Sequence, residues 1–252
     1  MLAHPTLDKL YALRLCGMAR AWEEQMRMTD LRELSFEERF GLLVDREMTE
    51  RCDLKLRIRL KMARLRLSAC VEDIDYRQPR GLDKGLLVDL ASCHWIKDRQ
   101  NILITGPTGV GKSYLACALG HKACREGYRT LYVRLPRLLQ ELHIARGDGR
   151  YGKVLAGLAR MDLLLIDDWG LAPMDDHSRR DILEILEDRH DVRSTIVTGQ
   201  LPVSGWHEMI GDPTLADAIL DRLVHNAYKI ELKGESMRKT LKSLTQSGHS
   251  GT

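Results

Sequence analysis

The sequence predicts an α/β fold, in which helices cover both faces of a parallel sheet and a small all-helical domain precedes it. Two observations carry this prediction. Between residues 101 and 232, short apolar runs alternate with longer helical stretches, and such alternation is typical of parallel sheets. Residues 1–75 instead carry apolar residues at helical spacing, with almost no glycine or proline after Pro5, which indicates helices without strands.

The predicted sheet has five strands. Each is a short apolar run bounded by turn residues or charges: Asn101–Thr105, Tyr128–Arg134, Leu163–Ile166, Ser194–Thr198 and Tyr228–Leu232. Helices are expected between them, at Lys112–Glu126, Pro136–Arg146, Ser178–Asp191 and Thr214–Asn226.

The helical spacing of apolar residues predicts three or four helices over residues 1–75. Ser35 followed three positions later by Glu38 is the pattern of a capping box, so one helix is expected to begin there. The stretch 76–85, YRQPRGLDKG, is rich in turn residues and is interpreted as a linker. We therefore expect an N-terminal domain over 1–75, a nucleotide-binding domain over 86–240 with a minimal lid, and a small polar tail over 241–252 that is disordered.

Composition excludes some classes of protein. The 252 residues are 44% hydrophobic and carry a formal charge of only +3, so any interaction with nucleic acid must depend on where the charges cluster. The six cysteines form no CxxC pair, which favours free thiols in a reducing compartment. No apolar run approaches the roughly 20 residues of a membrane span. A soluble, cytoplasmic protein with no membrane partner is expected.

The clearest motif is a phosphate-binding loop that follows the first strand. Its pattern G-x-x-x-x-G-K-S points backbone amides inward at phosphates, at the N-terminus of the next helix. The lysine is expected to reach the β and γ phosphates, and the serine hydroxyl to hold Mg²⁺. ATP binding is therefore predicted for Gly106, Pro107, Thr108, Gly109, Val110, Gly111, Lys112, Ser113 and Tyr114.

Two carboxylates follow the third predicted strand. Asp167 is expected to hold the Mg²⁺ shell together with Ser113, and Asp168 to orient the attacking water. The alternative is a solvated pair at a strand end, which the position after an apolar run downstream of a P-loop disfavours.

Further polar residues extend this prediction. Gln200, at the end of the next strand, is the first choice for a contact with the γ phosphate or the water, and Thr198 is the second. Arg222 is a candidate arginine finger for a neighbouring subunit, although a surface ion pair with Asp221 is the common explanation for such an arginine. Arg238 is a candidate contact with the nucleotide of its own subunit.

A basic helix lies in the N-terminal region. Seven cations face a single acid in the stretch RCDLKLRIRLKMARLRL, a density that suits contacts with DNA phosphates and gives little base specificity. The alternative is a solvated helix whose arginine stems cover apolar surface. The predicted DNA contacts are Arg51, Lys55, Arg57, Arg59, Lys61, Arg64 and Arg66.

The blocks NILITGPTGVGKSYLACALG, LLLIDDWG, STIVTGQLPVSGW and AILDRLVHNAYKIELKGESMRK, with RGLDKG, together resemble the IstB-like ATP-binding proteins. These are helper ATPases of bacterial insertion sequences, related to the DnaC helicase loader within the AAA+ group. The resemblance spans the chain to about residue 239. It implies an AAA+ domain, ATP-driven self-assembly on duplex DNA, and delivery of target DNA to a partner transposase that stimulates hydrolysis.

The resemblance also implies roles for single residues. Asp167 and Asp168 match the Walker B motif, Gln200 the first sensor, Arg222 the arginine finger and Arg238 the second sensor. The chain departs from the common pattern at Asp168, where many AAA+ proteins carry the longer glutamate, and this departure fits a slow ATPase that depends on its partner. It departs again in TGQ, where serine is more usual than glycine.

Three other functions share parts of this pattern. A DnaC-like loader would use the same ATPase core with a helicase as its partner. A metabolic P-loop kinase would need a substrate lid, for which the short C-terminal region leaves little room. A nucleotide-gated binding module would carry the same loop with negligible turnover.

Overall fold

The computed structural model describes residues 4–28 and 34–237. Arg238 and the predicted tail over 241–252 lie outside these residues. The chain divides into two compact units, Met1–Ile58 and Arg59–Thr252. We describe each unit by itself.

The first unit is helical, as predicted. It contains α1 (Pro5–Ala12), α2 (Cys16–Arg27) and the larger part of α3, which runs over Phe36–Ala63. The predicted capping box precedes α3: the Ser35 amide donates to Glu38 Oε2 at 2.8 Å, and the Glu38 amide donates to Ser35 Oγ at 3.2 Å. This reciprocal pair satisfies two amides that a helix N-terminus leaves without partners.

Helix α2 packs closely on α3 through Gly17. A Cβ atom at this position would lie 2.7 Å from the Cα atom of Glu47, so only glycine permits the approach. The Glu47 carboxylate accepts hydrogen bonds from the amides of Gly17 at 2.7 Å and Met18 at 3.1 Å. Glu47 thus caps the N-terminus of α2 from the neighbouring helix.

The second unit is built on one five-stranded sheet in the order β2-β3-β4-β1-β5, and all four strand pairs are parallel. The five predicted strands are confirmed, as β1 (Asn101–Thr105), β2 (Thr130–Arg134), β3 (Leu163–Trp169), β4 (Ser194–Gly199) and β5 (Ala227–Glu231). The third strand is longer than predicted. It continues through both aspartates, with an irregular register between Ile166 and Trp169.

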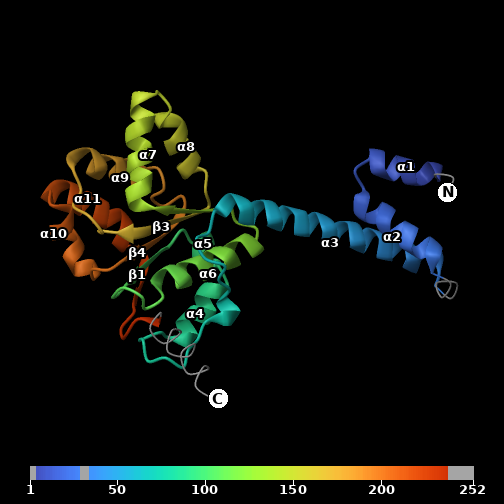
Figure 1. Cartoon of the computed structure of the whole chain (residues 1–252), viewed down its shortest axis with the longest axis horizontal. Helices are drawn as coiled ribbons and strands as arrows, with labels where there is room; N and C mark the ends of the chain where they lie inside the picture. The colour runs from blue at the N-terminus through green and yellow to red at the C-terminus, as the bar shows by residue number, and fades with distance from the viewer. Residues whose placement is uncertain (1–3, 29–33, 238–252) are drawn as a thin grey trace, which may run out of the picture. The chain divides into compact units, whose positions relative to one another are not determined.

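Alternate side chains of a strand point to opposite faces of the sheet. Helices cover both faces of this sheet (Figure 1). Ile102 and Ile104 pack in the core beneath α6 (Lys112–Arg125), α4 (Lys84–Ala91) and α5 (His94–Lys97). Leu103 packs in the opposite core. That face is covered by α7 (Leu135–Gly147), α8 (Tyr151–Ala159), α9 (Asp176–Glu187), α10 (Trp206–Ile210) and α11 (Pro213–Val224).

Four helices were not predicted: α4, α5, α8 and α10. Each has nine residues or fewer, which is too short for a clear helical periodicity. Helix α8 also contains Gly152 and Gly157, which lower helix propensity. Burial of Leu155 and Leu158 against the sheet stabilises it instead.

The boundary between the units falls within α3, after Ile58. The predicted linker, residues 76–85, comes after this boundary, and α4 begins inside it at Lys84. Residues 59–75 belong to the second unit and pack within it: Arg59 Nε donates to Cys124 O at 2.8 Å, and Ala69 is 1% exposed in the core. Within the described ranges, no helix has the length and hydrophobicity to cross a membrane.

Candidate nucleotide-binding site

The P-loop joins β1 to α6, and two of its positions require glycine. Gly106 has φ 141°, and a Cβ atom there would lie 2.2 Å from Leu232 O, in the segment that follows β5. Gly111 has φ 101° and stands immediately before α6. Both positions need a backbone conformation that L-residues with side chains rarely adopt. The loop therefore holds its amides at the N-terminus of a 14-residue helix, where anions bind well.

Lys112 is held inside the curl of this loop. Its ammonium donates to Gly106 O at 2.6 Å and to Pro107 O at 2.7 Å, and the residue is 9% exposed. Burial lowers the pKa of Lys112, and the nearby charges of Asp167 and Asp168 act in the opposite direction. A phosphate in the loop would give this ammonium a stronger partner than two carbonyl oxygens.

Asp167 is the most buried carboxylate of the site, at 2% exposure. It accepts hydrogen bonds from Ser113 Oγ at 2.9 Å, from the Tyr132 hydroxyl at 2.5 Å and from the Thr198 hydroxyl. Burial alone would raise the pKa of Asp167, but the bonds from Thr198, Tyr132 and Ser113 outweigh it and lower the pKa. The carboxylate is therefore ionised at neutral pH, beside a serine hydroxyl.

These two oxygen donors fit a magnesium ion. Mg²⁺ prefers hard oxygen ligands, and proteins commonly bind it through one or two side chains together with substrate phosphates. Ser113 and Asp167 lie within hydrogen-bond distance of each other at the edge of the phosphate loop.

Asp168 has a backbone conformation unusual for a residue with a side chain. Its φ is 63°, in the left-handed region that aspartate tolerates better than most residues. The register irregularity in β3 directs its carboxylate toward the end of β2, where Arg134 Nε donates to Asp168 Oδ2 at 2.6 Å. Strain of this kind is often found at functional sites.

A cavity of about 190 Å³, the phosphate cavity, is lined by residues predicted to contact the phosphates or the magnesium ion. Gln200, Thr198 and both aspartates line it, as predicted for the polar ends of neighbouring strands. Its lining residues are Arg66, Thr108, Gly109, Lys112, Ser113, Arg134, Asp167, Asp168, Thr198, Gly199 and Gln200.

Three residues of this site were not predicted to belong to it. Tyr132 and Arg134 come from β2, and the sheet order places β2 beside β3. Arg66 follows α3, and its Nη1 lies 3.6 Å from Asp167 Oδ2. The basic stretch predicts that Arg66 contacts DNA, whereas its side chain lines the phosphate cavity. Tyr132 and Arg134 could not be predicted as site residues, because no local sequence pattern reveals that β2 lies beside β3.

A second cavity of about 400 Å³ lies against the same loop and shares Gly109, Lys112 and Ser113 with the first. Tyr114, which was predicted to bind nucleotide, lines it together with Leu67 and Met237. The Arg80 guanidinium lies in its wall and donates to Val110 O at 3.1 Å and to Asp75 O at 2.8 Å. A mainly apolar hollow with a few polar groups suits a nucleoside.

Arg222 lies at the opposite end of the sheet. Its backbone carbonyl contacts Asn101, the first residue of β1, whereas the P-loop follows the last residue of that strand. Five residues of strand span about 16 Å, so the guanidinium does not join the phosphate cavity of its own chain. Its side chain forms an ion pair with Glu187, and its Nη1 lies 3.9 Å from Asp221 Oδ2.

The architecture and this site agree with the comparisons to known proteins. The family model described as IstB-like ATP binding protein matches residues 8–245. The chain belongs to this family. It is an ATP-binding protein of the kind associated with insertion sequences.

Relatives of this IstB-like chain include other insertion-sequence proteins. The insertion sequence ATP-binding protein y4pL of Sinorhizobium fredii is 56% identical over 239 residues, which cover 95% of this chain and 98% of that protein. The insertion sequence IS1162 ATP-binding protein of Pseudomonas fluorescens is 54% identical over 205 residues, covering 81% and 89%.

Among solved structures, the DnaC helicase loader superposes with a TM-score of 0.55 at 18% identity, covering 66% of this chain and 97% of that one. DnaI gives the same score at 22% identity, covering 66% and 92%. At these identities the likeness shows a shared fold.

Some predicted DNA contacts of the IstB-like chain bind other groups or line a cavity, although Arg51, Arg64 and Arg66 are also exposed to solvent. Arg51 Nε donates to Glu47 Oε1 at 2.6 Å, and Arg59 Nε donates to the backbone oxygen of Cys124. Arg64 lines a cavity of about 420 Å³ together with Arg66, Arg134 and Arg137. The remaining predicted DNA contacts are exposed to solvent: Lys55, Arg57 and Lys61.

Proposed function

We propose that this IstB-like protein hydrolyses ATP within assemblies that it forms on duplex DNA, and that it presents the bound DNA to a transposase of the same insertion sequence. One observation carries the proposal: the residues of the phosphate loop and both aspartates line one cavity, but Arg222, the candidate arginine finger, lies at the other end of β1. In this proposal a second subunit supplies the arginine.

In this proposal the loop grips the triphosphate. The amides of Gly109 to Ser113 and the Lys112 ammonium take the phosphates, and the carbonyl partners of Lys112 are released. The nucleoside occupies the second cavity, beside Tyr114 and Leu67. Arg80 supports this arrangement because it ties the loop at Val110 to the segment before α4.

Ser113 and Asp167 would hold magnesium. When bound, Mg²⁺ neutralises charge on the β and γ phosphates. The Tyr132 and Thr198 hydroxyls keep the Asp167 carboxylate oriented and ionised. Arg66 adds a second cation near the same carboxylate.

Asp168 would orient and polarise the attacking water, with Gln200 at the same cavity wall. In the structure Arg134 holds the Asp168 carboxylate in an ion pair. This pair must open before the carboxylate can bind a water. A slow ATPase that a partner accelerates would follow from that requirement.

Arg222 would reach the γ phosphate bound by the adjacent subunit, after leaving Glu187. Such a finger stabilises transition-state charge and can contribute on the order of 10³-fold or more in rate. ATP then favours assembly because it is the ligand that both subunits contact.

DNA binding in this proposal uses the exposed cations Lys55, Arg57 and Lys61. Each phosphate contact contributes about 0.9 to the slope of log K against log salt concentration. The relatives, named as insertion-sequence proteins, support a transposase as partner. A helicase-loading role has only the shared fold in its favour.

The test is the size of the protein by sedimentation and electron microscopy with duplex DNA, with and without a nonhydrolysable ATP analogue. Large assemblies that need both the analogue and DNA are expected. A protein that stays monomeric on DNA when the analogue is bound would exclude the assembly mechanism. Binding of a replicative helicase in preference to duplex DNA would favour the loader instead.

A further inference from the structure

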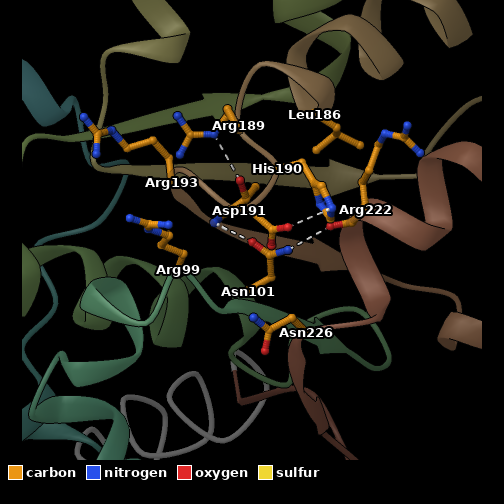
Figure 2. A pocket seen from close by; sticks show the side chains of 10 residues that line it. Arg99, Asn101, Leu186, Arg189, His190, Asp191, Arg193, Arg222 and Asn226 are labelled. Carbon is orange, nitrogen blue, oxygen red and sulfur yellow. Dashed lines mark hydrogen bonds and ion pairs between the residues drawn. The ribbon is translucent and has the colours of Figure 1, made fainter.

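We infer that Asn101 is a positioning residue for Arg222. It holds the backbone of Arg222 in place at the end of α11. The inference depends on the proposed role of Arg222 toward a neighbouring subunit. Asn101 opens β1 and is 9% exposed. Figure 2 shows it beside Arg222 in a small pocket lined by several arginines.

The Asn101 side chain uses all of its main hydrogen-bonding groups. Nδ2 donates to Arg222 O at 3.1 Å and to Leu223 O at 3.3 Å, and Oδ1 accepts from the Thr195 amide at 2.9 Å. The Asn101 backbone amide also donates to Asn226 O at 2.9 Å. One residue therefore joins the end of α11 to β1 and β4.

The chemistry of a helix end explains why an amide is suited to this position. The last carbonyl groups of a helix have no partner within the helix, and α11 ends at Val224. An amide side chain offers two N–H donors for such carbonyls and one acceptor for an amide. Aspartate at position 101 would keep the acceptor for Thr195 but would lose both donors to α11.

Asn101 binds the backbone carbonyl of Arg222 rather than its guanidinium. The guanidinium is bound separately, to Glu187 and, at 2.9 Å, to Ala218 O. It can therefore leave Glu187 for a phosphate while Asn101 keeps the helix end in place. A finger fixed at its base loses less conformational freedom when it reaches its target.

Strand β1 connects Asn101 to the nucleotide-binding loop of the same subunit. It pairs with β4 on one side and with β5 on the other, and all five of its residues are buried. Asn101 stands at one end of this central strand and Gly106 follows the other. The position of the finger is thus fixed relative to the nucleotide site of its own subunit, through a rigid element.

Mixed assemblies test this inference. A donor subunit with Asp168→Asn keeps its finger but not its own turnover, and an acceptor subunit with Arg222→Ala keeps its site but not its finger. Neither alone should hydrolyse ATP, and a mixture on DNA should regain activity. Adding Asn101→Asp to the donor is expected to lower the activity of the mixture about 10-fold to 100-fold, the scale expected for a catalytic group displaced by about 1 Å.

The same substitution in the acceptor is expected to change activity less than about 2-fold, because the acceptor contributes no finger. Equal losses in donor and acceptor would show that Asn101 acts only on folding, and would overturn the inference. A mixture of donor and acceptor that stays inactive even with Asn101 intact would instead refute the proposed role of Arg222 itself.

Asn226→Asp is the matched control, because it makes the same chemical change in the same pocket. Within residues 4–28 and 34–237, the Asn226 side chain makes no hydrogen bond, so no donor-specific loss is expected. Thermal unfolding and ATP-analogue binding establish that each variant folds. If Asn101→Asp does not fold, Asn101→Ser keeps one donor and one acceptor and should give a smaller loss, again confined to the donor.

Discussion

Replacement of Asp168 by asparagine separates catalysis from binding and folding. Asparagine tolerates the left-handed conformation that Asp168 adopts at φ 63°, so the bulge in β3 should persist. The lost partner is Arg134, in an ion pair whose side chains are 34% and 22% exposed. A pair exposed to this extent contributes about 1 kcal/mol or less, so the free energy of unfolding should change little.

The rate should change much more. A positioned general base contributes about 10²-fold to 10⁴-fold, or roughly 3 to 5 kcal/mol of activation free energy. We therefore expect Asp168→Asn to lower single-turnover hydrolysis on DNA by at least about 10²-fold, at unchanged affinity for a fluorescent ATP analogue.

Asp191→Asn is the matched control for this change. Asp191 also has positive φ, at 54°, and it is exposed outside the phosphate cavity. Its replacement should leave hydrolysis unaltered. If Asp168→Asn retained the wild-type rate within about 3-fold, or lost nucleotide affinity in proportion to its rate, the role assigned to Asp168 would be wrong.

Three further predictions concern residues that the fold brings into contact. Burial would raise the pKa of Glu47, but its hydrogen bonds from Arg51 and two amides hold it below the ordinary value of 4.5. This contribution to stability is present above pH 4.5 and is lost as pH falls through the folded pKa. Urea titrations from pH 7 to pH 3 should show that loss, and Glu47→Gln should make the loss smaller, since Asp167 and other carboxylates with lowered pKa remain. Tyr132→Phe should lower the free energy of unfolding by about 1.5 to 3 kcal/mol, because it removes a hydrogen bond to a buried carboxylate; Tyr128→Phe is its control, and an equal effect of both would contradict the reasoning. Arg66→Ala should alter Mg·ATP affinity and leave the salt slope of DNA binding unchanged; a slope reduced by about 0.9 would return Arg66 to the DNA surface.

The P-loop and the strands could be predicted from the sequence because their signals are local. Gly106 to Ser113 carry the phosphate-binding pattern within eight consecutive residues, and each strand is an apolar run of five to seven residues. The capping box at Ser35 and Glu38 is equally local, and its hydrogen bonds are present as expected. Patterns of this length depend on backbone conformation and on burial of one stretch of chain.

The partners of the site residues were decided by the tertiary structure. Arg134 and Asp168 are 34 positions apart, and they meet only because β2 lies beside β3 in the sheet. Arg66 belongs to a basic stretch by sequence and to the phosphate cavity by position. Asn101 reads as an ordinary strand start, yet it binds the end of a helix more than a hundred positions away. Sequence determines which groups are charged, apolar or flexible, but strand order and helix packing determine which of those groups meet, because these contacts form between segments whose separation along the chain carries no local pattern.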